Sequence, residues 1–129
     1  MHRSRLGGIF IDCETADVDT AAAFWAAALG ANVTANEGAA SIYRELKTQS
    51  DSLEVLVQRV SHPSRVHIDI HTDDLEAEVQ RLAGLGAIPG ERVKRWCVMQ
   101  APTGQRFCVV EVKPEALVGG ARTWPQKPA

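Results

Sequence analysis

The side chains with the clearest chemical potential lie on one predicted strand, residues 66–70, and just after it. His67, Asp69 and His71 occupy alternate positions, and aliphatic residues lie between them. Because successive side chains of a strand point to opposite faces, all three titratable groups face the same side. Two interpretations remain open. The row is either a hydrogen-bonded structural feature, or a ligand-binding and acid/base site in which Asp69 orients an imidazole and His67 transfers the proton.

Glu54 and Cys108 are the other candidate reactive groups. A carboxyl group in a dry cavity has a raised pKa, which suits a general base, so Glu54 is the second candidate catalytic residue beside His67. The alternative is that Glu54 forms an ion pair with Arg106 or Arg44. Cys108 lies in an apolar run, where a cysteine is either a small buried hydrophobe or, next to a cation, a reactive thiol.

These residues belong to two similar halves of the chain. A shift of 57 residues aligns Ile11-Asp12 with Ile68-Asp69, and a shift of 56 residues aligns residues 29–31 with 85–87, both Leu-Gly-Ala. Each half has the pattern of a strand, an acidic turn, an amphipathic helix that ends at Leu-Gly-Ala, and three further strands. The repeat therefore predicts two βαβββ modules.

The expected elements follow from this repeat. In the first half we expect a strand at 6–13, a helix that ends near Leu29, and strands at 32–36, 41–46 and 53–60. In the second half we expect a strand at 66–70, a helix, and strands at 87–93, 95–100 and 106–112. Asp17 or Asp19 is expected to cap the first helix, and Thr72 with Asp73 the second. The expected core-facing residues are Ala21, Phe24, Trp25 and Ala28 in the first helix and Leu75, Val79 and Leu82 in the second.

Composition narrows the function classes. The 129 residues suffice for one domain with its own core, and a net charge of -2 with mixed signs argues against nucleic-acid binding. The longest apolar stretch, Ala21 to Gly30, is about half of what a bilayer crossing needs. The N-terminal residues lead directly into the first strand, so we expect no secretory signal. Three cysteines without CxxC spacing indicate free thiols and a cytoplasmic protein.

Three groups of residues add to the pattern of two modules. They are Phe24-Trp25 in the first helix, residues 65–70 (Arg-Val-His-Ile-Asp-Ile), and residues 101–108 (Ala-Pro-Thr-Gly-Gln-Arg-Phe-Cys). Together they resemble the vicinal-oxygen-chelate superfamily, and more narrowly the glyoxalase-like domains related to glyoxalase and bleomycin-resistance proteins. The resemblance implies an α+β fold in which two tandem βαβββ modules form a curved mixed sheet around one cavity. It places the domain at 1–112, with modules at about 6–60 and 65–112, and leaves 113–129 as a tail that is ordered only if Trp124 finds a surface.

Strand alternation then divides the strand residues between the two faces of this curved sheet, whose inner face forms a cup around the expected cavity. Ile9, Ile11 and Cys13 are expected to face the first helix, and Val66, Ile68 and Ile70 the second. Glu54, Leu56 and Gln58 point inward from the fourth strand, and Arg106, Cys108 and Val110 from the last. The resemblance implies a ligand-binding set of Phe10, Asp12, Asp69, His71, Trp96, Arg106 and Cys108. The alternative for Asp12 is that it stabilises the junction between the two modules, and the alternative for Trp96 is that it packs in the core.

Metal-dependent members of the superfamily place four ligands at the cup floor. By resemblance, His67 and Glu54 match two of these positions. Phe10 lies at a third position, where a phenyl ring cannot coordinate, and Cys108 stands where a carboxylate is expected. The resemblance therefore implies an incomplete site. We expect no certain cofactor, and the alternative is a divalent metal such as zinc, nickel or manganese on His67 and Glu54.

Two functions follow from the resemblance. The first is a binding protein that holds a metabolite or drug-like molecule in the cup. The alternative is a metal-dependent lyase, isomerase or dioxygenase-type enzyme that uses His67 and Glu54, and the superfamily is too diverse in chemistry for the fold to choose. The expected partners are a small-molecule ligand and a second copy of the chain in a homodimer, which would cover exposed strand edges.

Overall fold

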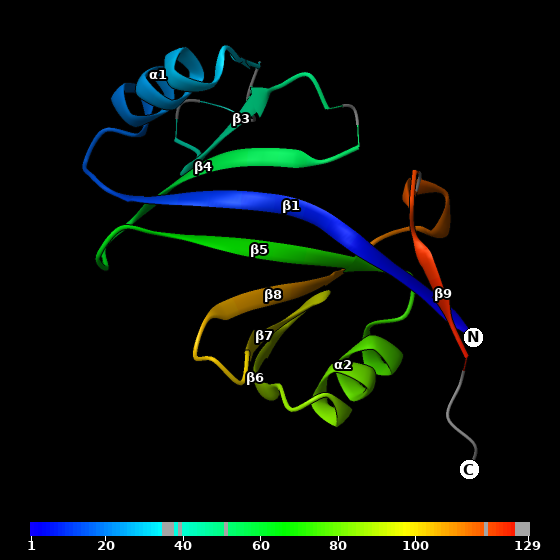
Figure 1. The fold of residues 1–129 in the computed structure, drawn as a ribbon. Coiled ribbons are helices and arrows are strands. Elements are labelled where there is room, and N and C mark those ends of the chain that lie inside the picture. The colour runs from blue at the N-terminus through cyan, green and yellow to red at the C-terminus, as the bar shows by residue number, and fades with distance from the viewer. Residues whose placement is uncertain (35–37, 39, 51, 118, 126–129) are drawn as a thin grey trace. The chain divides into compact units, whose positions relative to one another are not determined.

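The computed structural model describes residues 1–34, 38, 40–50, 52–117 and 119–125 (Figure 1). Two α-helices, one short 3₁₀ helix and nine strands are present in this part of the chain. In chain order they are β1 (His2–Glu14), α1 (Val18–Leu29), β2 (Asn32–Val33), β3 (Tyr43–Lys47), β4 (Glu54–Val60), β5 (Arg65–Thr72), α2 (Leu75–Gly84), β6 (Ile88–Val93), β7 (Trp96–Gln100), β8 (Arg106–Glu111), η1 (Pro114–Ala116) and β9 (Arg122–Trp124).

This order confirms the predicted α+β class and the predicted repeat. The pattern βαβββ occurs from β1 to β4 and again from β5 to β8. Each predicted strand has a counterpart, although β1 starts four residues earlier than expected and β2 is short. Residues 35–36 of the predicted second strand lie outside the described residues. None of the described helices is long and apolar enough to cross a bilayer.

The chain forms two compact units. The first unit is Gly8–His67, and the second unit is Met1–Gly7 together with Ile68–Ala129, so β1 and β5 each contribute residues to both units. The strand order in the first unit is β2-β3-β4-β1, in which β1 and β4 are parallel and the other pairs are antiparallel. The parallel register places Gly8 opposite Glu54 and Asp12 opposite Gln58.

The second unit repeats the same pattern of strands. Its order is β5-β8-β7-β6, with β5 and β8 parallel and the other pairs antiparallel. Asp69 is the register partner of Cys108, and His71 is the partner of Val110. A parallel pair within a module requires a long crossover, and each helix lies in that crossover.

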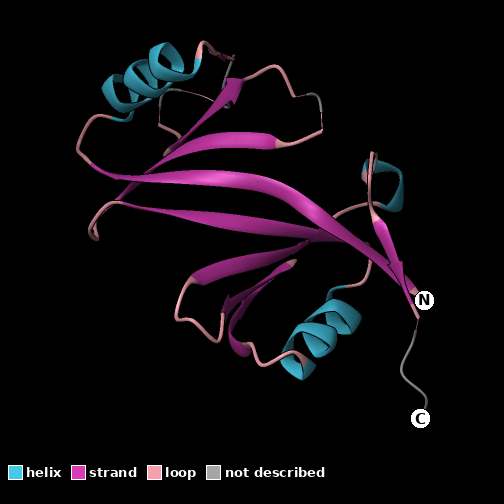
Figure 2. Cartoon of the chain, in the orientation of Figure 1, coloured by secondary structure: helices cyan, strands magenta, loops and turns pink. Residues whose placement is uncertain are grey.

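In the first unit, α1 packs on β3 and β4, as Figure 2 shows. The buried core joins α1 to the sheet through Ile11, Val18, Ala22, Ala26, Leu46, Val55 and Val57. The sequence predicts Phe24 and Ala28 in this core, but both are exposed, Phe24 by 62%. The helix instead presents the spacing Val18, Ala22 and Ala26, and these small side chains let the backbone approach the sheet closely. Trp25 packs against the edge of this core.

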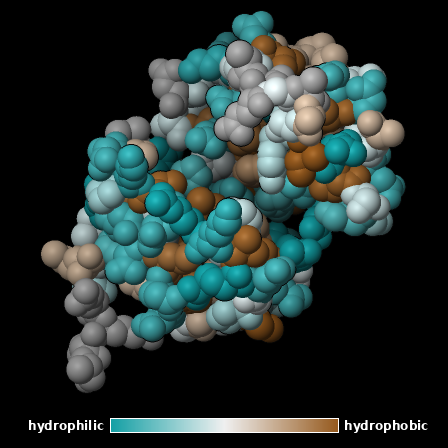
Figure 3. All heavy atoms as spheres, turned by 180° about the vertical axis from the view of Figure 1, so that it is seen from behind, coloured by the Kyte–Doolittle hydropathy of each residue, from teal (hydrophilic) through white to brown (hydrophobic). Residues whose placement is uncertain are grey.

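In the second unit, α2 packs on β6, β7 and β8. The core contains Leu75, Val79, Leu82, Cys97, Met99, Phe107 and Val109, which confirms the predicted stripe of the second helix. The sequence predicts that Val66, Ile68 and Ile70 face this helix. Ile70 packs against the core, but Val66 and Ile68 are 61% and 42% exposed. Strand alternation sets the face of a residue, and only the position of the helix decides whether that face is covered. Apolar side chains reach the surface on the face drawn in Figure 3.

Of the two predicted N-terminal helix caps, the first is confirmed and the second is wrong. The Asp17 carboxylate accepts from the amides of Asp19 and Thr20 at the start of α1, and Gly30 ends that helix with a φ of 65°. The second helix is capped by Asp74, which accepts from the Ala77 amide, and not by Thr72 or Asp73. Thr72 and Asp73 instead bind the main chain and side chain of Arg3 on β1.

The segment after β8 contains a short strand, and Trp124 in this strand lies against the start of β1. β9 pairs antiparallel with the start of β1, with His2 opposite Trp124. The Trp124 indole N–H donates to Ser4 Oγ at 2.8 Å, and the Arg81 guanidinium lies 3.9 Å from the ring centroid. A cation over an aromatic face is attracted by the ring quadrupole.

A fully buried carboxylate lies beside this strand. Glu78 of α2 is 0% exposed, receives two hydrogen bonds of 2.8 Å from Arg81, and lies 2.7 Å from Nε2 of His2. Burial by itself raises the pKa of Glu78, but hydrogen bonds from Arg81, His2 and Ser4 outweigh it, so the pKa lies below its ordinary value. This cluster joins β1, α2 and β9 within the second unit.

Candidate functional site

His67 in the first unit is held by a buried carboxylate. Nδ1 of His67, on β5, lies 2.7 Å from Oδ2 of Asp12, on β1. The side chains of Asp12 and His67 are 2% and 13% exposed. Arg65 contributes a weaker contact, with Nε 3.6 Å from the same oxygen. Within the described part of the chain, the buried Oδ1 of Asp12 has no hydrogen-bond partner.

This hydrogen bond defines the tautomer of His67. When the imidazole is neutral, its Nδ1–H donates to the carboxylate and the lone pair is on Nε2. The carboxylate also fixes the orientation of the ring. The pair therefore has the arrangement of an oriented acid/base or ligand-binding group.

Aromatic rings lie next to this imidazole. Phe10 on β1 stacks on His67 with centroids 4.8 Å apart and an interplanar angle of 13°. Tyr43 on β3 meets Phe10 edge-on at 6.1 Å, and its hydroxyl accepts a 3.4 Å contact from the Gln58 amide. These residues lie on the face of the sheet opposite α1, since the alternating Ile11, Val55 and Val57 point into the helix core.

Glu54 begins β4 on the same face of the first unit. Partial burial, and then the charge of Glu45, raises the pKa of Glu54. A carboxyl group with a raised pKa is better matched to proton transfer near neutral pH than an ordinary one. Arg44, one of the two expected ion-pair partners of Glu54, donates to Asp19 at 2.7 Å and to the carbonyl oxygens of Ser41 and Tyr43.

The second unit holds the other expected site residues. Asp69 and Cys108 are neighbours in register, with Asp69 7% exposed and Cys108 half-buried. His71 lies against Gly7, and burial followed by the charge of Arg5 lowers its pKa. The remaining two expected residues are at the surface, Trp96 by 38% and Arg106 also exposed.

Within the described residues of each unit, the candidate ligands predicted from the sequence do not make a complete metal centre. The first unit offers His67 and Glu54, and the position that the repeat pairs with His67 holds Phe10, whose ring stacks on that imidazole. The second unit offers Asp69 and Cys108 side by side. Protein zinc sites use three or four protein ligands. Two donors in each unit do not meet that requirement, so we derive no reaction step through a metal.

Asp12 holds Nδ1 of His67, a contact that the sequence did not predict. The expectation that Asp69 orients an imidazole stays a prediction. The repeat contains the missing signal, because it aligns Asp12 with Asp69 and so makes β1 and β5 equivalent strands. What the repeat does not contain is the register between these two strands, which decides that Asp12 reaches His67.

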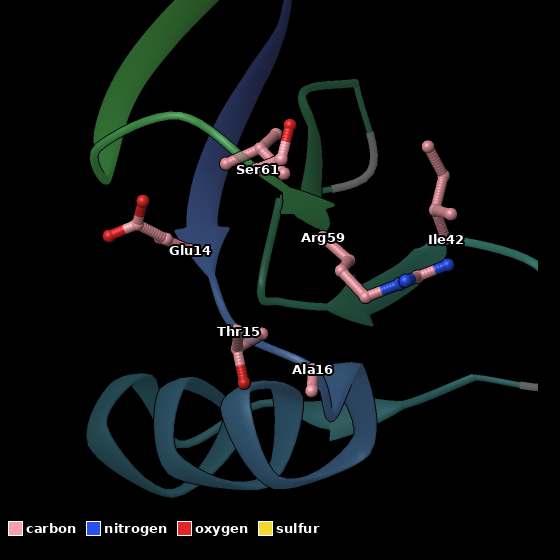
Figure 4. A pocket seen from close by; sticks show the side chains of 7 residues that line it. Glu14, Thr15, Ala16, Ile42, Arg59 and Ser61 are labelled. Carbon is pink, nitrogen blue, oxygen red and sulfur yellow. The ribbon is translucent and has the colours of Figure 1, made fainter.

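An open hollow of about 490 Å³ lies elsewhere in the first unit (Figure 4). It is formed where β1 and β4 end side by side, because parallel strands place their carboxyl ends at one edge of the sheet. The lining residues are Glu14, Thr15, Ala16, Ile42, Arg59, Val60 and Ser61. None of the residues that the sequence predicts for the site lines this hollow.

The model of the glyoxalase-like domain matches residues 8–110 of the chain. The chain belongs to the glyoxalase-like domain family. This confirms the resemblance drawn from the sequence. No curated protein matches the chain.

Solved structures with the glyoxalase/bleomycin-resistance fold are similar to this glyoxalase-like chain. Methylmalonyl-CoA epimerase from Mycobacterium tuberculosis has a TM-score of 0.58 at 16% identity, covering 85% of this chain and 89% of its own. A hypothetical protein from Bacillus halodurans C-125 has a TM-score of 0.59 at 12% identity, with 85% and 95% covered. A glyoxalase/bleomycin resistance protein/dioxygenase superfamily member from Vibrio splendidus 12B01 has a TM-score of 0.51 at 17% identity, with 80% and 96% covered. At these identities the likeness establishes the fold.

Proposed function

We propose that this glyoxalase-like protein binds a small organic molecule, of metabolite or drug-like size, on the sheet face that carries His67. The observation that carries the proposal is the 2.7 Å hydrogen bond from His67 Nδ1 to the buried Asp12 carboxylate. It fixes the orientation of the imidazole on this face.

The pair is costly as a purely structural feature. Removing a carboxylate from water costs several kcal/mol, and a hydrophobic pair of similar size often stabilises a fold as well. Asp12 is 2% exposed and its second oxygen has no hydrogen-bond partner among the described residues. A buried polar group that is incompletely satisfied is a feature of functional sites more than of optimised cores.

The surroundings of His67 fit the ligand class. Phe10 and Tyr43 offer aromatic surface, and Leu56, the register partner of Phe10, is half-buried. Small-molecule sites combine such apolar walls with a few oriented polar groups. The ligand expected here has an apolar ring or chain and one polar group that hydrogen-bonds with the imidazole.

The test is a fragment screen by NMR with the full-length protein. Hits should perturb the ring signals of His67 and Phe10, and His67→Gln and Asp12→Asn should each weaken the same hits by about tenfold or more. His62→Gln is the matched control, since His62 bonds to the carbonyl oxygen of its own neighbour, Pro63. Hits that keep their affinity in both site variants would refute the proposal.

A second candidate function is proton transfer next to a carbonyl group, as in a lyase or isomerase. It is favoured by Glu54, whose pKa is raised by partial burial and by Glu45, on the same sheet face as His67. In this reaction His67 or Glu54 would remove a proton from the carbon next to the carbonyl group and return the proton to a neighbouring atom of the substrate. The check is exchange of substrate protons for deuterium, followed by NMR. Exchange that is equal in wild-type protein and in Glu54→Gln with His67→Gln would exclude this activity.

A further inference from the structure

The hollow at the ends of β1 and β4 contains a positive charge on the helix side of the sheet. Side chains alternate along β4, so Arg59 faces the same side as Val55 and Val57, which lie in the core under α1. Arg59 and Ser61 both line the hollow of about 490 Å³, a volume in the range of small-molecule sites. The hollow is therefore separate from the opposite sheet face, which carries His67.

The internal repeat gives this hollow a counterpart in the second unit. The registers of the two parallel strand pairs make Gln58 equivalent to Cys108, so three residues later Ser61 is equivalent to Glu111. The Glu111 carboxylate accepts a hydrogen bond of 3.0 Å from the Leu75 amide at the start of α2. An anion is stabilised at this end of a helix by the unpaired amides and the helix dipole. The second module thus holds a carboxylate of its own at the place where the first module has the hollow.

The first module has a cation at this place instead of an anion. By the same registers, Arg59 is equivalent to Val109, which is a core residue with 0% exposure. Within the described part of the chain, the Arg59 guanidinium forms no ion pair. Figure 4 shows the Arg59 side chain directed toward Ile42 and the Glu14 side chain directed the other way. The hollow therefore presents a positive charge that no described carboxylate balances.

The carboxylates at the start of α1 are already engaged. Asp17 accepts from two later amides of the helix, and Asp19 is bound by Arg44 at 2.7 Å. Val18 is the equivalent of Leu75, and no described side chain accepts a hydrogen bond from its amide. The first unit thus lacks the internal carboxylate that the second unit has, and a carboxylate from outside fits the same place.

We propose that this hollow binds a small aliphatic monocarboxylate, with the carboxylate on the Arg59 guanidinium and the Ser61 hydroxyl and the carbon chain on Ile42. A guanidinium and a carboxylate match through two parallel hydrogen bonds. One guanidinium balances one negative charge, and the nearby Asp17 and Glu14 disfavour a doubly charged phosphate. Ile42 is half-buried and offers apolar surface inside the hollow. The site uses other residues than the proposed function and does not depend on it.

The experiment is a titration of the full-length protein with butyrate, followed by NMR of the backbone amides. The signals of Thr15, Val18 and Ser61 should move together. Arg59→Gln should weaken butyrate binding by about tenfold, because it removes the charged donor. The matched control is Arg95→Gln, which removes an exposed arginine of the second unit and should leave butyrate binding unchanged.

A second variant tests the comparison between the modules. Ser61→Glu supplies the side chain that Glu111 has in the second unit, so the added carboxylate should pair with Arg59 and exclude butyrate. His67→Gln should leave butyrate binding unchanged, which separates this site from the sheet face of the proposed function. Butyrate affinity that Ser61→Glu leaves unchanged would contradict the equivalence of the two places.

Three further probes define the ligand class. Butyrate should bind more tightly than acetate by about threefold or more, because it places two more methylene groups on apolar surface. Inorganic phosphate should bind more weakly than butyrate, and butylamine, a cation with a similar chain, should not move the same signals. Butyrate binding that Arg59→Gln does not weaken would overturn the proposal. So would acetate or phosphate that binds as tightly as butyrate, or butylamine that binds in the hollow.

Discussion

Replacement of Glu78 by glutamine should strongly destabilise the second unit. The carboxylate is 0% exposed and is bound by Arg81 through two hydrogen bonds of 2.8 Å and by His2 at 2.7 Å. Glutamine has almost the same shape, but its amide cannot accept from both nitrogens of Arg81, and the partly buried guanidinium is left without a counter-charge. Breaking a buried ion pair from one side costs about 3–5 kcal/mol, so we expect a loss of about 3 kcal/mol and a fall of about 10 °C in Tm.

The pH dependence of stability gives the same residue a second, independent signature. The folded-state pKa of Glu78 lies below its ordinary value of 4.5, because hydrogen bonds to the carboxylate outweigh burial. A depressed pKa means that the carboxylate stabilises the fold above the unfolded-state pKa, and that this contribution is lost as the pH falls through the folded-state pKa. Wild-type protein should therefore lose stability below about pH 4.5 more steeply than Glu78→Gln, which has no carboxyl group to protonate.

Urea denaturation at several pH values measures both effects. The matched control is Glu76→Gln on the same helix, where the carboxylate is exposed and pairs with the exposed Arg92, so its denaturation midpoint should hardly change. A loss below about 1 kcal/mol in Glu78→Gln would refute the reasoning. So would wild-type and Glu78→Gln stabilities that stay parallel between about pH 6 and about pH 3.

Three further predictions concern the site and the assembly. Glu45→Gln should lower the pKa of Glu54, because it removes a like charge. The pKa is measured by NMR from the carboxyl carbon of Glu54. An unchanged pKa would mean that burial alone raises it. Elemental mass spectrometry of the untagged protein should find zinc, nickel and manganese below stoichiometry. Stoichiometric metal that His67→Ala and Glu54→Ala remove would instead establish the metal-dependent alternative. Sedimentation equilibrium should give the mass of a homodimer. The reason is that β6 is the edge strand of the second unit and its Ile88 is 61% exposed. A monomer mass at high protein concentration would exclude the homodimer.

Local sequence patterns predicted the elements well because each pattern has a local physical cause. Period-two alternation placed Glu54, Leu56 and Gln58 on one face of the fourth strand, and in the structure Val55 and Val57 of the opposite face lie in the helix core. The Asp17 cap and the stop at Gly30 follow from unpaired amides and from a left-handed backbone that glycine adopts easily. The internal repeat predicted the second module from the first.

The errors arose where an outcome depends on packing between distant elements. Phe24 is apolar and lies at a helical spacing, yet α1 turns its alanine face to the sheet, and Phe24 is exposed. Val66 and Ile68 have the predicted alternation but are exposed. Hydropathy describes what a side chain favours, and only the placement of the neighbouring element decides whether it is buried.

For this protein, the sequence by itself determined the βαβββ repeat, the family, and the presence of His67 among titratable residues on one strand face. These depend on periodicity and on residue types that are adjacent in the chain. Tertiary structure decided that Asp12 holds His67, that Gly7 makes room for His71, and that Trp124 lies against the strand that carries His2. Each of these contacts joins residues more than fifty positions apart, and strand register and packing, which no local pattern encodes, bring them together.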